Sequence, residues 1–246
     1  MDRDYGAAYR ELYRRHWWWR EREAAILSEL RRICPAAGWQ RVLDVGCGDG
    51  LFFDRLQEFG AVEGVEPEGA LLDPEGPWRS VIHPVPFDER FRPPHQFGLI
   101  LMLDVLEHLA EPEGALRHAL RLLAPGGSVL ITVPAFQSLW TRHDDLNHHF
   151  RRYTRTTFRR LAGAAGLRIT RDRYLFQWLV LGKLAVRALE ALRPGAPRPP
   201  PIPPRPLNAL LRAVTRAERA FGSLVPMPLG SSLLVIGSAE APAPRR

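Results

Sequence analysis

The sequence predicts an α/β protein built on a mostly parallel sheet, and three observations support this class. Short apolar runs rich in Val, Ile and Leu (RVLDVG, AVEGVE, GLILMLDV and GSVLITVP) alternate with segments of helical character. Strands that alternate with helices at this spacing are typical of βαβ units, whose strands run parallel. The first run ends in a cluster of glycines, as expected for a tight turn at a ligand site. The length of 246 residues with 46% hydrophobic residues is ample for a buried core.

The remaining elements follow from periodicity and composition. Residues 5–33 repeat apolar side chains near the 3.6-residue helical period and predict a helix. Residues 174–192 and 207–221 predict amphipathic helices, separated by the proline-rich stretch RPGAPRPPPIPPRP, which predicts an extended linker. The run SSLLVIGS predicts a last strand at the sheet edge.

These elements predict four parts of the chain. They are an N-terminal helical lid (1–40), a core (41–173, completed by a strand at 231–238), a helical, proline-rich insertion or cap (174–230) and a flexible tail (239–246).

The net charge of +7 is unevenly distributed along the chain. From Arg151 onward, 18 Lys and Arg residues stand against 4 acidic ones, a net +14, which leaves −7 for residues 1–150. Basic apolar helices suit an anionic membrane surface, a cap over a substrate or a dimer contact. Nucleic acid is not expected, because no recognisable binding motif accompanies the charge.

The low cysteine count and the lack of a recognisable signal peptide lead us to expect a cytoplasmic protein. Peripheral membrane contact through residues 174–222 is a further option. Two cysteines give no disulfide framework. The charged N-terminal residues do not resemble a signal peptide, and no apolar stretch is long enough to span a membrane.

The strongest motif is VLDVGCGDG, residues 42–50. A strand that runs into Gly46 and Gly48 lets a ligand approach the backbone, as a nucleotide-like cofactor would require. Glu66, twenty residues beyond Gly46, ends the second strand and can accept hydrogen bonds from ribose hydroxyls. A dinucleotide fingerprint needs a third glycine at position 51, where Leu51 stands.

This pattern resembles the class I S-adenosylmethionine-dependent methyltransferases. The segments FGLILMLDVLEHL and LRLLAPGGSVLITVP resemble that family's fourth strand and its fifth-strand unit. The resemblance implies a Rossmann-like, seven-stranded sheet with helices on both faces, an N-terminal helical lid and a helical insertion before the last strand. It also implies S-adenosylmethionine as cofactor and S-adenosylhomocysteine as product.

Carried over residue by residue, the resemblance assigns a cofactor site. Asp44, Gly46 and Gly48 would hold the methionine end and Glu66 the ribose, with Cys47 as a small residue in the turn. The remaining positions are Pro67 beside the adenine, Leu103 and Asp104 beside the methionine moiety, and His108 close by. Many relatives have an acidic residue after the third strand that receives the adenine amino group. This sequence has Val81, Ile82 and His83 at that point, and Asp88 is the candidate to take over this role.

The polar stretch RHDDLNHHFRRY, residues 142–153, follows the predicted fifth strand and faces the ligand crevice. It resembles a motif of a broad bacterial group of these methyltransferases whose substrates are largely undefined. The residues that match this motif are Trp140, His143, Asp144, His149, Arg152 and Tyr153.

A hydroxyl acceptor needs a base, for which a neutral histidine is suited. The candidate catalytic residues are His143, His149, Asp144 and Tyr153, and purely structural polar contacts are the alternative. His143, His148 and His149 could supply metal ligands, but their spacing fits neither a zinc-finger nor a H-E-x-x-H pattern, so no metal is expected. Arg152, Arg155 and Arg159, expected on one helix face, indicate an anionic acceptor or a solvated surface.

Trp17, Trp18 and Trp19 sweep about 200° of a helix, because successive residues are about 100° apart. At least one should leave the core stripe, either as a lid over the cofactor or as packing elsewhere. Arg20 and Arg22, on the same predicted helix, are candidates to pair with the cofactor carboxylate.

The sequence therefore predicts methyl transfer from S-adenosylmethionine to a nucleophilic atom, most simply oxygen, of a small or lipid-like, anionic acceptor. Transfer to nitrogen or carbon, or a non-catalytic cofactor-binding module, are the alternatives. The oligomeric state is left open.

Overall fold

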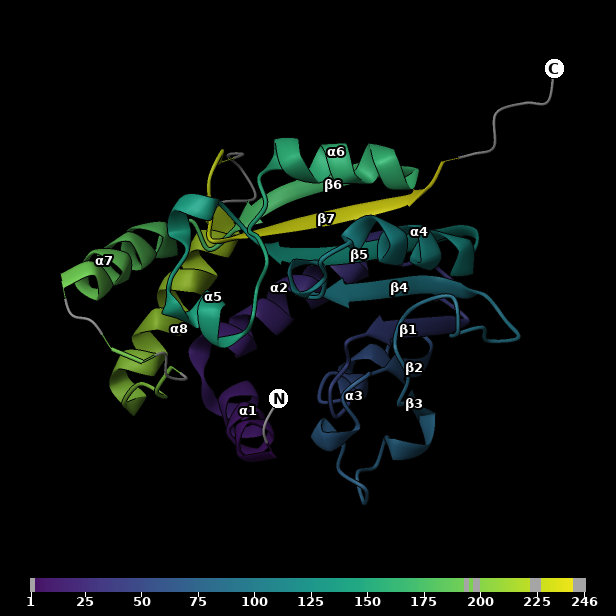
Figure 1. The fold of residues 1–246 in the computed structure, drawn as a ribbon, viewed down its shortest axis with the longest axis horizontal. Helices are drawn as coiled ribbons and strands as arrows, with labels where there is room; N and C mark the ends of the chain where they lie inside the picture. Colours follow the sequence, from purple (N-terminus) through teal and green to yellow (C-terminus); the bar gives the residue numbers. More distant parts are fainter. Residues whose placement is uncertain (1–2, 193–194, 197–199, 222–226, 241–246) are drawn as a thin grey trace.

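The computed structural model describes residues 3–192, 195–196, 200–221 and 227–240, and places seven strands in one sheet (Figure 1). The sheet order is β3-β2-β1-β4-β5-β7-β6. The strands are β1 (Arg41–Val45), β2 (Ala61–Val65), β3 (Ile82–His83), β4 (Phe97–Leu103), β5 (Leu123–Pro134), β6 (Leu167–Leu175) and β7 (Ser232–Ala239). β7 runs antiparallel to both of its neighbours, β5 and β6. The other four strand pairs, β3–β2, β2–β1, β1–β4 and β4–β5, are parallel. The predicted mostly parallel, Rossmann-like sheet of seven strands is confirmed.

The last strand does not lie at the sheet edge, where the sequence placed it. β7 is inserted between β5 and β6, so the edge strand on that side is β6. Its residues Ser232 to Gly237 are buried without alternation. A continuous apolar run that is covered on both faces is typical of an internal strand.

Helices cover both faces of the sheet. α4 (Pro112–Leu122) and α6 (Arg155–Ala165) pack on one face, where Leu116 and Phe158 are fully buried. α2 (Trp17–Ile33) and the short α3 (Phe53–Leu56) pack on the other, with Leu30 and Phe53 fully buried.

The N-terminal segment forms two helices rather than the single one predicted. α1 (Arg3–Arg15) ends before His16, whose backbone is extended and whose ring accepts a hydrogen bond from the Trp18 amide at 3.1 Å. A side chain that satisfies a free amide in this way begins a new helix. Periodicity alone does not show such a break.

The remaining helices lie in the connections. After β2 the chain forms only short 3-10 turns, η1 (Gly69–Leu71) and η2 (Arg79–Val81), as its prolines indicated. Two further 3-10 turns, η3 (Leu106–His108) and η4 (Gln137–Leu139), and the short helix α5 (Arg142–Leu146) follow β4 and β5.

The predicted helical insertion is α7 (Leu179–Leu192) and α8 (Arg205–Phe221), between β6 and β7. In Figure 1 both helices lie at the left of the molecule, the side toward which β4 and β5 point. α7 begins at 179 because β6 continues to Leu175. Within the described residues, no helix has the length and apolarity needed to cross a membrane. Residues 193–194 and 197–199 of the predicted linker and residues 241–246 of the predicted tail lie outside the described residues.

Candidate active site

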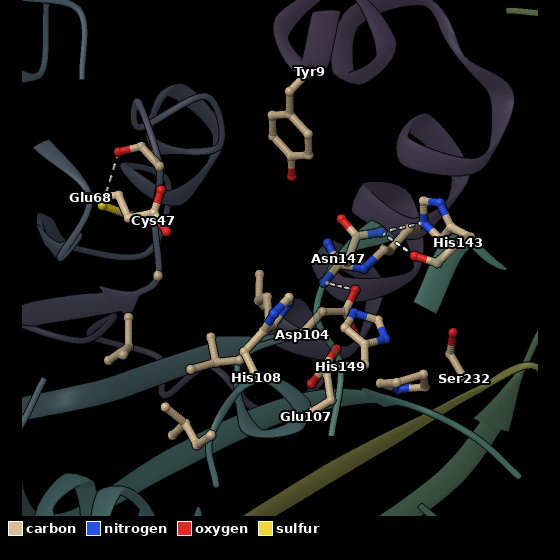
Figure 2. Close-up of a pocket in the computed structure, with 18 of the residues that line it drawn as sticks. Tyr9, Cys47, Glu68, Asp104, Glu107, His108, His143, Asn147, His149 and Ser232 are labelled. Carbon is tan, nitrogen blue, oxygen red and sulfur yellow. Dashed lines mark hydrogen bonds and ion pairs between the residues drawn. The ribbon is translucent and has the colours of Figure 1, made fainter. Parts of the chain in front are cut away.

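A cavity of about 1380 Å³ lies at the carboxyl ends of the parallel strands. Its walls come from α1 and α2, the glycine turn after β1, the segment after β4, the polar stretch around α5, and α7. Figure 2 shows Cys47 and Glu68 on one side of this cavity, and His108, His149 and Asn147 on the other. A cleft at this edge of a parallel sheet is the expected ligand position.

The glycine turn has the conformation that its sequence requires. Gly46 and Gly48 have φ values of +70° and +52°, in the left-handed region that favours glycine. A Cβ on Gly48 would meet no described atom within 4 Å, so the backbone is open to the cavity. Glu66 braces the turn because its carboxylate accepts hydrogen bonds from the amides of Gly48 (2.9 Å) and Glu68 (3.0 Å).

Two buried acidic side chains lie around this turn. Burial raises the pKa of Glu66, and it raises the pKa of Asp44 to about 7, with Arg22 opposing the second rise. The Asp44 carboxylate is 4% exposed and forms no hydrogen bond with any residue that the structure describes. It therefore suits a cationic donor such as an amino acid ammonium. Burial also raises the pKa of the Cys47 thiol, so Cys47 is a small turn residue and not a nucleophile.

Arg22 closes the other end of the cofactor region. It reaches from α2 to Asp104 at 2.8 Å and to the Thr132 hydroxyl at 2.9 Å. Asp104 follows Leu103 at the end of β4 and has a φ of +57°. The guanidinium that the sequence suggested for a cofactor carboxylate thus lies beside the predicted methionine pocket. The residues fit the amino acid end of S-adenosylmethionine.

On the predicted adenine side, the candidate polar residues are already paired within the chain. Pro67 is exposed and lines the cavity. Asp88 also lines it, but its carboxylate is paired with Arg90 at 2.6 Å. His83 is paired with Glu63 at 3.3 Å.

The polar stretch after β5 is organised around one buried carboxylate. Asp144 is fully buried and receives two bonds from Arg152, both 2.9 Å, and one from the Thr141 amide at 2.8 Å. The third partner residue is His149, whose Nδ1 atom lies 2.9 Å from the carboxylate. Although burial opposes the charged form, these donors hold the pKa of Asp144 below its usual range. Asp144 is therefore an anion that orients the His149 ring.

The other candidate catalytic residues lie close by but in different settings. His143 lines the cavity beside Asn147, and burial together with the nearby Lys183 lowers its pKa to about 4. Tyr153 is buried, and its hydroxyl donates to the Leu106 carbonyl oxygen at 3.2 Å. His148 is exposed. Of the three histidines in the stretch, His149 is the one that a carboxylate orients.

Three possible metal ligands also meet here, although the sequence predicted no metal. Ligand atoms of Glu107, His108 and His149 lie within 4.8 Å of one another. Glu107 is fully buried, neither carboxylate oxygen has a hydrogen-bond partner among the residues that the structure describes, and burial raises its pKa well above the usual range. Sequence spacing does not reveal this cluster, because His149 is far from the other two residues in the chain.

The predicted arginine face is not an open anion site. Arg152 precedes α6, so it does not share a helix face with Arg155 and Arg159 as expected. Arg155 and Arg159 both pair with Asp172, at 2.6 and 2.8 Å. These ion pairs satisfy the arginines within the chain.

The N-terminal helices form one wall of the cavity, and their action as a lid stays a prediction. Trp17 and Trp19 are almost fully buried, Trp18 is half-buried, and all three line the cavity. Arg10 of α1 reaches across to Asp49 of the glycine turn at 2.7 Å. Helix α1 is thus joined directly to the cofactor turn.

Sequence reasoning missed Lys183, the only lysine of the chain. It lies on α7 and lines the cavity, and burial followed by the charge of Arg152 lowers its pKa to about 8. Its ammonium forms no hydrogen bond or ion pair with any residue of the described chain. The isolated lysine in an arginine-rich chain was the available signal.

Comparisons with known proteins agree on the family. A family described as a methyltransferase domain matches residues 18–171. The ubiquinone biosynthesis O-methyltransferase of Pseudomonas entomophila (strain L48) is 29% identical over 143 residues, 50% of this chain and 59% of that protein. The chain thus spans less than two thirds of this relative's length.

Solved structures share the fold at low identity. A chain from the complex between the Haloferax volcanii Trm112 methyltransferase activator and a methyltransferase gives a TM-score of 0.60 at 16% identity, over 98% of this chain and 97% of that one. A SAM-dependent methyltransferase from Archaeoglobus fulgidus gives 0.52 at 17% identity, over 87% and 93%.

Proposed function

The chain belongs to the methyltransferase-domain family and is an S-adenosylmethionine-dependent methyltransferase, and from this premise we propose that it methylates a hydroxyl oxygen of a small, anionic acceptor. The observation that carries the proposal is the oriented His149 ring. The cofactor supplies an activated methyl group, so the protein must align the acceptor and remove its proton. An acceptor that keeps a free electron pair, such as a neutral amine, needs no such base.

Different residues of the chain would hold the different parts of the cofactor. Glu66 would accept hydrogen bonds from the ribose hydroxyls, with the lone pairs that its two amide contacts leave free. Asp44 would receive the ammonium of the cofactor, and Arg22 would pair with its carboxylate. The open backbone of Gly48 lets the cofactor lie against the turn.

His149 then acts as the general base. Its Nδ1 atom faces the Asp144 carboxylate, so the ring proton belongs on Nδ1 and Nε2 is left as an acceptor. Tyr153 is a positioning residue, because its hydroxyl holds the backbone at Leu106, two residues from His108.

The anionic part of the acceptor is assigned to Lys183. The ammonium lies on the cavity wall in a site that lowers its pKa, where an anion would stabilise the charge. His143 and Asn147 lie on the same wall and can contact polar groups of the acceptor.

The names of the curated relatives support oxygen as the methylated atom. They are O-methyltransferases of ubiquinone biosynthesis, and the match covers half of this chain. The similarity supports a hydroxylated acceptor with an apolar part, for which the tryptophan wall is suited.

The test uses cofactor with a ¹³C-labelled methyl group and a bacterial metabolite extract. The ¹³C shift of the product distinguishes methyl on oxygen, nitrogen and carbon, and an O-methyl product is expected. His149→Ala should lower turnover about 100-fold or more, the usual contribution of a general base, with cofactor affinity unchanged. His148→Ala, the exposed neighbour, should retain wild-type turnover. A labelled N-methyl or C-methyl product would overturn the assignment.

A second chemistry is favoured by the Glu107, His108 and His149 cluster. A divalent cation there would use His149 as a ligand instead of a base, and could itself lower the pKa of an acceptor hydroxyl. Chelation separates the two possibilities. If His149 is the base, turnover by the wild-type protein is unchanged after dialysis against EDTA.

A further inference from the structure

We propose that the outward faces of α7 and α8 form a docking surface for an anionic lipid bilayer at the mouth of the cavity. The apolar surface, as we call it, comprises Leu181, Leu184, Leu189, Leu192, Leu207, Leu210, Val214 and Phe221. The inference depends on the orientation of two helices and not on which atom is methylated.

Helix α7 exposes its apolar face, whereas an ordinary surface helix buries that face. At 100° per residue, Leu181, Leu184, Leu189 and Leu192 fall within roughly 140° of one another. Leu181 and Leu192 are 75% and 77% exposed, and α7 has no buried residue among those described. Its charged Lys183 and Glu190 lie opposite and line the cavity. A surface helix normally turns its apolar stripe inward.

Helix α8 repeats this arrangement. Leu207, Leu210, Val214 and Phe221 fall within roughly 60° of one another, and Phe221 is 72% exposed. The opposite, polar face attaches α8 to α2. Arg212, Arg216 and Arg219 all pair with the buried Glu21, at 3.2, 3.0 and 3.1 Å.

The two helices are joined at one end, where α7 begins and α8 approaches its last residue. Trp178, next to the first residue of α7, donates to Glu218 at 2.9 Å and to Thr215 at 3.2 Å, both on α8. Figure 1 shows both helices on the left of the molecule. Exposed apolar side chains gathered in this way mark an interaction surface.

Charge favours a bilayer over a second copy of the chain. Residues 174–221 carry eight Lys and Arg residues and two Glu, a net +6, which becomes +5 when Glu21, the partner of three of these arginines, is counted. A symmetric dimer through this surface would bring two such segments together, and like charges repel. An anionic bilayer attracts the segment and accepts the leucines and phenylalanine at the interface.

The apolar surface lies beside the cavity, so docking on a bilayer would bring the cavity close to the lipids. Leu179 and Val186 of α7, together with Pro200 and Pro201, line the cavity beside the apolar surface. An acceptor with a lipid tail could enter from the bilayer without crossing water. This connects the surface to the proposed acceptor, but vesicle binding can be measured without any acceptor.

The test measures sedimentation of the full chain with phosphatidylcholine vesicles, with and without phosphatidylglycerol. The chain should bind vesicles that contain phosphatidylglycerol, and salt should weaken the binding. The triple variant Leu181→Gln, Leu192→Gln and Phe221→Gln should bind at least tenfold more weakly. Phe150→Gln, which removes a 59% exposed phenylalanine outside the surface, is the matched control and should bind normally.

Circular dichroism and cofactor titration verify that the triple variant is folded, which is expected because the changed side chains are exposed. Failure of the wild-type chain to bind anionic vesicles would overturn the proposal, as would undiminished binding by the folded triple variant. A wild-type dimer in light scattering that becomes monomeric in the triple variant would assign the surface to a second copy. Methyl transfer to a water-soluble acceptor is measured in a separate assay. The proposed function can therefore fail or succeed independently of vesicle binding.

Discussion

At the scale of single residues, Asp144 connects the stability of the site to its chemistry. Its carboxylate is fully buried and is held by Arg152, Thr141 and His149. A buried anion with several donors is stable only while those donors remain, because an unpaired buried charge is costly. The same contacts fix the orientation of the His149 ring.

Arg152→Met should therefore destabilise the fold by about 3–5 kcal/mol, the usual cost of breaking a buried ion pair. Thermal or urea unfolding measures this loss. Arg155→Met, which breaks a partly exposed pair with Asp172, should cost about 1 kcal/mol or less.

The pH dependence of the Arg152→Met loss has a definite sign. The pKa of Asp144 is depressed in the folded state, so its contribution is present above the ordinary carboxyl pKa and declines as the pH falls below about 4. The difference between wild type and variant should shrink on acidification. A difference that is constant from neutral to acidic pH would contradict the assignment.

Lys183 predicts how acceptor binding depends on pH. Its pKa is lowered to about 8, so the ammonium is charged below that pH and neutral above it. The KM for an anionic acceptor should rise as the pH increases through about 8 to 9, because a bound anion itself favours the charged form. Lys183→Met should raise KM at neutral pH and remove this rise.

Arg187→Met is the control for Lys183, since it removes a charge from an exposed position on the same helix. It should leave the KM profile as in wild type. A profile that is the same in wild type and in Lys183→Met would show that the acceptor does not contact Lys183.

At the scale of elements, α1 and the glycine turn are joined by the Arg10–Asp49 ion pair. If α1 covers bound cofactor, this pair should slow its escape. Arg10→Ala is expected to increase the dissociation rate of S-adenosylhomocysteine several-fold, measured by stopped-flow displacement. Arg14→Ala, an exposed residue on α1, should leave the rate unchanged. Equal rates in all three proteins would argue against a lid.

The elements that sequence periodicity predicted well are those with local causes. The glycine turn and the apolar strands of the core depend on residues that are adjacent in the chain. The break at His16 depends on one side-chain cap, and the start of α6 at Arg155 on the Thr154 cap. The internal position of β7 depends on pairing with β5 and β6, which periodicity does not specify.

The same distinction between local and long-range causes applies to the residues of the site. Sequence motifs indicated Asp144 and His149 because the two residues lie five positions apart in one motif. They did not indicate Glu107 beside His149, or Lys183 beside His143, because the fold brings these residues together from separate elements. The outward orientation of the leucines in α7 was equally hidden, since an amphipathic pattern does not say which face is covered.

At the scale of the whole molecule, the insertion is placed between two strands that would otherwise form a hairpin. Leu175 at the end of β6 pairs with Ser232 at the start of β7, so the chain leaves and re-enters the sheet at one point. The two described helices between these residues, α7 and α8, lie on the side of the molecule toward which β4 and β5 point (Figure 1). The cofactor turn and the insertion are thus contributed by opposite ends of the sequence to one cavity.

This arrangement predicts that the insertion can be removed without loss of the cofactor site. Replacing residues 178–229 by a short glycine-rich turn should leave a folded sheet, because the paired ends of β6 and β7 are already adjacent. S-adenosylmethionine should still bind, with affinity within about tenfold of wild type by calorimetry. Glu21, which loses its three arginine partners, becomes exposed to water and needs no replacement.

The same deletion should abolish turnover and vesicle binding, because it removes Lys183 and the apolar surface together. Leu234→Asp is the contrasting variant: it places a charge at a fully buried position in β7, and should prevent folding where the deletion does not. If the deletion unfolds the chain, the insertion is part of the fold's core and not an addition to it. If it folds but no longer binds cofactor, the aromatic contact between Trp17 and Trp178 is needed to hold α2 against the cofactor site.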